Sequence, residues 1–139
     1  MPYLYDAHQG GALISDAIGR RTADRLRQFA ESRFPGRFRE LGIWFRGPLC
    51  YVDIYRDPGP SPDGWSAEES NETREQYRDR LAATPIHLCR MRYFGNPDRW
   101  SFALYNEVTG DYEPATFPSG QAAGPPEDAL EFVVNVHLD

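Results

Sequence analysis

The chain has 139 residues, enough for a sizeable hydrophobic core, and we expect residues 1–139 to form a single domain. Its 15 basic and 21 acidic residues give a net charge of −6, which argues against a general nucleic-acid binder. No apolar run approaches the length of a membrane span and no signal peptide is recognisable, so we expect a cytoplasmic protein without membrane contact.

Charge is unevenly distributed along the chain. All basic residues are arginines. Residues 20–46 contain eight of them against three acids, whereas residues 107–139 contain seven acids and no arginine. A local basic patch is therefore compatible with a chain that is acidic as a whole.

The first element expected is an amphipathic helix from about Ser15 to Arg33. Apolar residues recur there at helical spacing, and the charged residues lie largely on the opposite face. Ser15 is a suitable N-cap with Asp16 in the first turn, and Phe34-Pro35-Gly36 ends the helix.

Five strands are expected after this helix. Residues 40–46 and 49–55 form a hairpin that turns at Gly47-Pro48. Residues 86–94, 100–105 and 112–117 form an antiparallel meander with two Gly-containing turns. Because proline cannot donate to a strand ladder, Pro114 confines the last strand to an edge.

Alternation of side chains predicts two different faces for this sheet. The inward face is apolar: Leu41, Ile43, Phe45, Cys50, Val52, Ile54, Cys89, Met91, Tyr93, Trp100, Phe102 and Leu104. The reverse face combines arginines with aromatic rings: Trp44, Arg46, Tyr51, Asp53, Tyr55, Arg90, Arg92 and Tyr105. The same alternation places Leu88 beside Arg90 and Arg92 on the reverse face.

The remaining segments connect and cover the strands. Residues 57–70 form a Pro-, Gly- and Ser-rich loop that contains Trp65. A solvated helix follows over residues 72–83, or it already begins at Ser66, since Ser66 and Glu69 have the spacing of a capping box. For residues 125–138 we favour a helix over a last strand, since proline and acids occupy its first turn. The predicted fold is two-layer α+β: an antiparallel meander of about five strands, with the N-terminal and C-terminal helices packed on one face.

The Arg/aromatic face is the main candidate site. Tryptophan, tyrosine and arginine are enriched at protein-binding hot spots, so we expect a non-catalytic binding module for a protein partner or for self-association. The loop with Trp65 is a second candidate contact. Stacked rings beside arginines also suit unpaired bases, which makes single-stranded nucleic acid an alternative ligand. The structural alternative is a solvated face on which Asp53 forms a cross-strand ion ladder with Arg90 or Arg92.

The sequence gives less support to a catalytic or metal-binding site. Cys89 and His87, assigned to one strand face, suggest a thiol-dependent hydrolase or transferase, but apolar neighbours predict a buried, inert thiol. His8, His87, His137, Cys50 and Cys89 lack the paired spacings of zinc sites, and no phosphate-binding pattern is present. We therefore expect no metal and no cofactor.

Several segments resemble a family of small bacterial proteins with no known activity: Phe38–Ile43, Phe45–Gly47, Cys50–Asp53, His87–Arg90, Arg92–Gly95 and Asp98–Ala103. The resemblance covers roughly residues 34–117 and the later PPED segment. It implies a single intact domain from a bacterium and transfers no functional residue, cofactor or partner.

Overall fold

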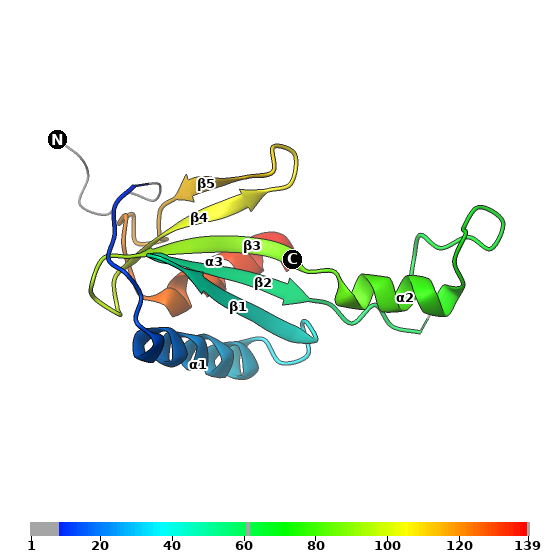
Figure 1. The fold of residues 1–139 in the computed structure, drawn as a ribbon, viewed down its shortest axis with the longest axis horizontal. Coiled ribbons are helices and arrows are strands. Elements are labelled where there is room, and N and C mark those ends of the chain that lie inside the picture. Colours follow the sequence, from blue (N-terminus) through cyan, green and yellow to red (C-terminus); the bar gives the residue numbers. More distant parts are fainter. Residues whose placement is uncertain (1–8, 61, 139) are drawn as a thin grey trace.

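The structure, a computed structural model, describes residues 9–60 and 62–138. Its elements in chain order are α1 (Asp16–Arg33), β1 (Glu40–Arg46), β2 (Leu49–Tyr55), α2 (Arg74–Ala83), β3 (Ile86–Tyr93), β4 (Trp100–Asn106), β5 (Asp111–Ala115) and α3 (Pro126–Leu138). Each strand pairs antiparallel with the next one along the chain, so the sheet is a simple meander. α1 and α3 contact one another and the same face of this sheet (Figure 1), which confirms the predicted α+β fold.

α1 begins and ends where the sequence predicts. Ser15 has an extended backbone, and its hydroxyl accepts a hydrogen bond from the Ile18 N–H at 3.2 Å. Arg25 then joins α1 to α3, because its guanidinium donates two hydrogen bonds, of 2.8 and 3.0 Å, to the Glu127 carboxylate. It also forms an ion pair of 2.9 Å with Asp98. This bidentate contact fixes the two helices side by side over the sheet.

The core lies between the sheet and these two helices. Trp100 and Phe102 of β4 are fully buried, and the Phe102 ring meets Phe117 and Phe132 edge to face at 4.7 and 5.7 Å. The inward alternation predicted for β1, β2 and β4 is confirmed by the residues that form or border this core: Leu41, Ile43, Phe45, Cys50, Val52, Ile54, Trp100, Phe102 and Leu104.

The face predicted for Leu88 is wrong, because β3 contains a β-bulge. Val52 pairs with Cys89, but the next residue on β2, Asp53, pairs with His87, so the register skips Leu88. One extra residue reverses the alternation of the side chains that precede it. Leu88 is consequently fully buried in the core beside Cys89, and His87 lies on the opposite face.

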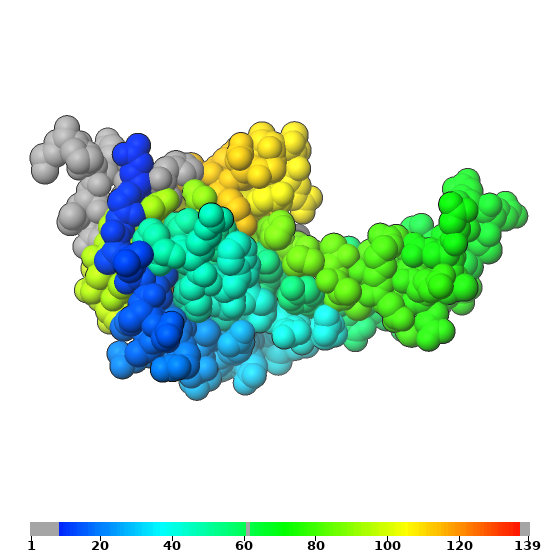
Figure 2. Space-filling model, in the orientation of Figure 1, coloured from blue at the N-terminus to red at the C-terminus, as the bar shows by residue number. Residues whose placement is uncertain are grey.

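The segment between β2 and β3 projects from the body of the protein as an arm (residues 56–60 and 62–85; Figures 1 and 2). No residue of α2 is buried, as expected for a solvated helix. α2 starts at Arg74 and not near Ser66, because Thr73 and Gln76 form a reciprocal capping box. Residues 66–70 make only a single turn, closed by a hydrogen bond from the Ser70 N–H to the Ser66 carbonyl.

The C-terminal segment is helical, as we favoured. Before it, β5 ends at Ala115, two residues earlier than predicted, and Phe117 turns into the core with 3% of its surface exposed. β5 carries Pro114 and is an edge strand, in agreement with the sequence argument. Within residues 9–60 and 62–138, no helix is both long and apolar enough to cross a membrane.

Candidate functional site

On the face of the sheet opposite α1 and α3, called the open face below, rings from all five strands contact one another in series. Trp44 and Tyr51 are stacked, with centroids 3.9 Å apart and planes at 6°. Tyr51 meets Tyr112 edge to face at 5.8 Å, and Tyr112 meets Tyr105 at 5.1 Å. Tyr105 in turn meets the His87 imidazole at 4.9 Å. The register positions these rings, because Trp44 lies opposite Tyr51, and Tyr105 lies opposite Tyr112.

Asp53 closes this series into a ring of side chains. Its Oδ1 lies 2.9 Å from Nδ1 of His87, and its Oδ2 accepts a longer hydrogen bond of 3.4 Å from the Trp44 indole N–H. Asp53 is only 5% exposed, and a carboxylate at such a depth needs donors to replace water. We call the closed set the open-face cluster: Trp44, Tyr51, Asp53, His87, Tyr105 and Tyr112.

The imidazole of His87 is oriented by this contact. An ionised carboxylate only accepts hydrogen bonds, so the hydrogen between the two side chains belongs to Nδ1 of His87. The His87 side chain is 39% exposed, while that of Asp53 is 7% exposed. The pair therefore joins a buried acceptor to a partly exposed ring, and it holds the β2 and β3 ends of the cluster together.

The cluster also presents polar groups, from Tyr112 within it and from the neighbouring Arg90. The Arg90 guanidinium lies 5.0 Å from the centroid of the Tyr112 ring, a cation–π distance. Burial, and secondarily the charge of Asp53, raises the pKa of Tyr112 to about 12. The Tyr112 hydroxyl is therefore neutral at physiological pH and can donate a hydrogen bond.

Three other predicted residues lie at the margins of the open face. Arg46 is exposed at the end of β1. The half-buried ring of Tyr55 faces the Arg39 guanidinium at 5.6 Å. Arg92 is only 9% exposed, and its Nη1 donates to the carbonyl of Gly10 at 2.7 Å. Arg92 thus binds the segment that precedes α1, and its contribution to an exposed surface is small.

Trp65 lies away from the open face, within the arm. Its indole N–H donates to the Glu72 carbonyl at 2.9 Å, and the Arg74 guanidinium lies over its ring at 5.1 Å. Nearby, the Tyr77 hydroxyl donates to the Asp63 carbonyl at 2.9 Å. Gly64 permits this approach, since it has φ of +92° and a Cβ there would sit 2.7 Å from the Tyr77 oxygen. Trp65 therefore helps to fix the loop of the arm onto α2.

Two members of the cluster, His87 and Tyr112, were not predicted as binding residues. Tyr112 could have been found from the hairpin register, which places it opposite Tyr105 across the turn. His87 could not, because simple alternation gives it the face of Cys89 and only the bulge transfers it to Asp53.

The thiol hypothesis finds little geometric support. Cys89 is fully buried on the helix side of the sheet, whereas His87 lies on the open face, so the assumption that they share a face is wrong. Burial, and secondarily the charge of Asp53, raises the pKa of Cys89 to about 12. Cys50, also buried and reduced, has a pKa raised well above the usual value by burial and by Cys89. At neutral pH both thiols are therefore protonated and buried in the core.

Within the described residues, no three His, Cys, Asp or Glu side chains lie close enough together to hold a metal ion. The imidazole of His8 and that of His137 lie outside the described part of the chain. No protein-family model, curated protein sequence or solved structure matches this chain.

Proposed function

We propose that this chain is a non-catalytic protein-binding module and that the open-face cluster contacts its partner protein. The observation that carries this proposal is Trp44, whose surface is 45% exposed although the indole stacks on Tyr51 and donates to the buried Asp53. A tryptophan held in one orientation offers a large contact area and loses little conformational entropy on binding.

The form of the cluster also supports a protein as its ligand. Neighbouring rings touch each other at centroid distances of 3.9 to 5.8 Å, which leaves no room for a small molecule between them. A surface of packed rings with an arginine beside it is typical of the centre of a protein interface, where aromatic residues and arginine are enriched. Small ligands instead occupy concave sites.

Single-stranded nucleic acid is the alternative ligand, favoured by the exposed indole of Trp44 on the same face as Arg46 and Arg90. Two features weaken it. Trp44 and Tyr51 cover each other, so few ring faces remain for successive bases, and the chain has a net charge of −6. The alternative predicts affinity for an oligonucleotide that falls steeply with salt, because phosphate contacts release counterions.

The proposal can be tested by placing a photo-crosslinking amino acid at position 44 in cells, with position 108 as control. Val108 is 95% exposed in the turn between β4 and β5, and it takes no part in the ring contacts of the open-face cluster. We expect one dominant protein adduct from position 44 that is absent from position 108 and resists nuclease digestion. No adduct at position 44, or the same adducts at both positions, would contradict the proposal.

Once that partner is purified, substitutions measure the contribution of the cluster. Trp44→Ala and Arg90→Gln are each expected to weaken its binding about 30-fold, corresponding to about 2 kcal/mol for a hot-spot residue. Val108→Ala is the matched control and should leave the affinity unchanged. Circular dichroism of each variant separates loss of the surface from loss of the fold.

A further inference from the structure

Two hollows lie between α1 and β1, on the opposite side of β1 from the open face, and we call the line that joins them along β1 the α1–β1 groove. β1 is an edge strand, and in the part of the chain that the structure describes its only strand partner is β2. In an edge strand, the backbone N–H and C=O groups of alternate residues point away from the sheet. Among the described residues, no backbone group outside β2 forms a hydrogen bond with residues 40–46. This edge can therefore accept another strand.

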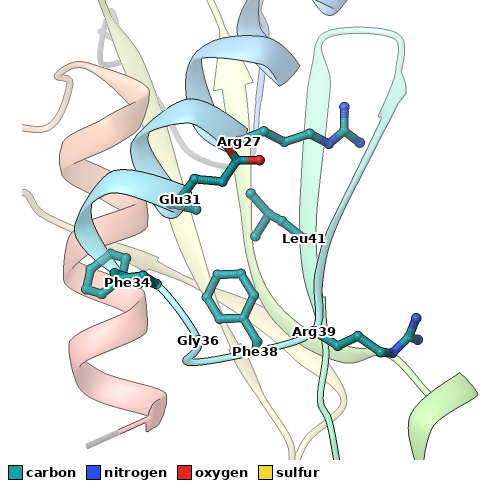
Figure 3. A pocket seen from close by; sticks show the side chains of 9 residues that line it. Arg27, Glu31, Phe34, Gly36, Phe38, Arg39 and Leu41 are labelled. Carbon is teal, nitrogen blue, oxygen red and sulfur yellow. The ribbon is translucent and has the colours of Figure 1, made fainter.

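The groove contains two hollows, one at each end of β1. The first has a volume of about 320 Å³ and an apolar floor of Phe34, Phe38 and Leu41, with Arg27, Glu31 and Arg39 at its rim. Figure 3 shows the Phe38 ring and Leu41 facing this hollow below α1, with the long side chains of Arg27 and Arg39 extending to the same side.

The second hollow has a volume of about 330 Å³ and lies beside Ile14, Gly19 and Phe45, with Asp16 and Arg20 at its rim. Gly19 borders this hollow: a Cβ at that position would make an ordinary van der Waals contact of 3.4 Å with the Phe45 ring, and a longer side chain would extend into the space. Glycine inside a helix costs about 1 kcal/mol relative to alanine. Because Gly19 has no side chain, space remains between α1 and β1 at this end of the groove.

The two hollows have the spacing of side chains on one face of a strand. Leu41 and Phe45 are four residues apart on the same face of β1, a distance of about 13 Å. A strand added beside β1 has the same pleat, so its residues i and i+4 would face the first and second hollow. Arg20 and Arg27, on the other wall of the groove, are seven residues apart, or about 10 Å along α1.

The charge around the groove is positive. Two of the eight arginines in residues 20–46, Arg25 and Arg33, form ion pairs with α3 through Glu127 and Glu131. Around the two hollows themselves, Arg20, Arg27 and Arg39 outnumber the acids Asp16 and Glu31 by one. Arg20 and Arg27 form no ion pair within the described part of the chain. They are therefore available to carboxylates of a ligand.

We propose that the α1–β1 groove binds an extended, net-acidic peptide of a partner protein, which adds a sixth strand beside β1. The peptide places apolar side chains from positions i and i+4 in the two hollows, and its acidic side chains reach Arg20 and Arg27. Strand addition in a groove between an edge strand and a helix combines main-chain hydrogen bonds for affinity with side-chain pockets for specificity. This surface is separate from the open-face cluster, and the inference does not depend on that cluster.

The test is a selection of random peptides of about twelve residues, displayed on phage, against the whole protein. Enriched sequences should share apolar residues at i and i+4 with acidic residues nearby. A synthetic copy of the best sequence is then titrated by fluorescence anisotropy. Proline placed between the two apolar residues should abolish its binding, because proline cannot donate to the ladder and distorts the added strand.

Two variants probe the groove independently. Gly19→Leu fills the second hollow, and the double substitution Arg20→Glu with Arg27→Glu reverses the rim charges. Each is expected to weaken the peptide at least about tenfold, whereas Arg21→Glu, exposed on the same helix but lining neither hollow, should change the affinity less than about threefold. If Gly19→Leu lowers the thermal midpoint, the double variant still decides the question.

Several results would overturn the inference. The first is that the enriched peptides lack apolar residues at i and i+4. The second is that the protein enriches peptides no better than the Gly19→Leu variant does. The third is that both groove variants bind the peptide with unchanged affinity. Sedimentation supplies another: a dimer of this chain that dissociates on Gly19→Leu would assign the groove to a second copy. Because the readout uses a synthetic peptide, it is independent of any partner crosslinked at position 44.

Discussion

Replacing Leu88 by alanine tests the β-bulge on which the open-face cluster depends. Leu88 is fully buried, and the substitution removes three carbon atoms from the core. At about 0.8 kcal/mol for each buried CH₂ group, the lost transfer free energy is about 2.4 kcal/mol. The cavity left behind adds to this loss, so we expect the free energy of unfolding to fall by about 3 kcal/mol.

The assay is urea denaturation followed by circular dichroism. With a denaturant slope of about 2 kcal/mol/M, the midpoint of Leu88→Ala should fall by about 1.5 M. Leu13→Ala, at a leucine that is 82% exposed, is the matched control and should change the free energy by less than about 0.5 kcal/mol. A similarly small change for Leu88→Ala would place Leu88 in solvent, and His87 could then not reach Asp53 from the open face.

Three further predictions concern the cluster, the thiols and the arm. In a double-mutant cycle, Asp53→Asn and His87→Gln should show a coupling free energy of about 1 kcal/mol in urea unfolding; additive effects would mean that their 2.9 Å contact contributes nothing. Cys50 and Cys89 should resist alkylation in the native protein and react after unfolding. Because burial raises both pKa values, unfolding releases their protons above pH 9, and stability should fall by about 1 kcal/mol per pH unit for each thiol, up to about pH 12 in the case of Cys89; with both replaced by alanine, this slope should be absent. Thr73→Ala should speed hydrogen exchange at the start of α2 by destabilising it by about 1 kcal/mol, without changing global unfolding, since α2 buries no residue.

The strongest sequence predictions concerned local structure. The limits of β1 and β2 and the start of α1 were all predicted within one residue, because caps, turns and side-chain periods act over a few neighbours. The opposite faces of β1, β2 and β4 followed from the same alternation, which no irregularity interrupts in those strands. Helix was also the better choice for residues 126–138, where proline and two acids begin the element.

The candidate site was only partly predictable. The sequence assigned Trp44, Tyr51, Asp53, Arg90 and Tyr105 to one face, and the structure brings these five side chains together. Arg92 shares that strand face, but its guanidinium donates to Gly10, more than eighty residues away in the sequence. No pattern around Arg92 indicates such a contact, because it depends on where the segment before α1 crosses the ends of β2 and β3.

The sequence by itself determined the strands, the two packed helices, and an open face on which arginines and rings alternate with core residues. Only the tertiary structure decided that β3 carries one residue more than β2 at Leu88. The position of a bulge depends on the pairing of two strands and on the layer packed against them. Because Leu88 and Cys89 are both buried under the helices, the His87 side chain lies on the other face, beside Asp53. Hydrophobic periodicity within one strand does not indicate where such a bulge lies. His87 could therefore be assigned to the cluster only once the strands were paired.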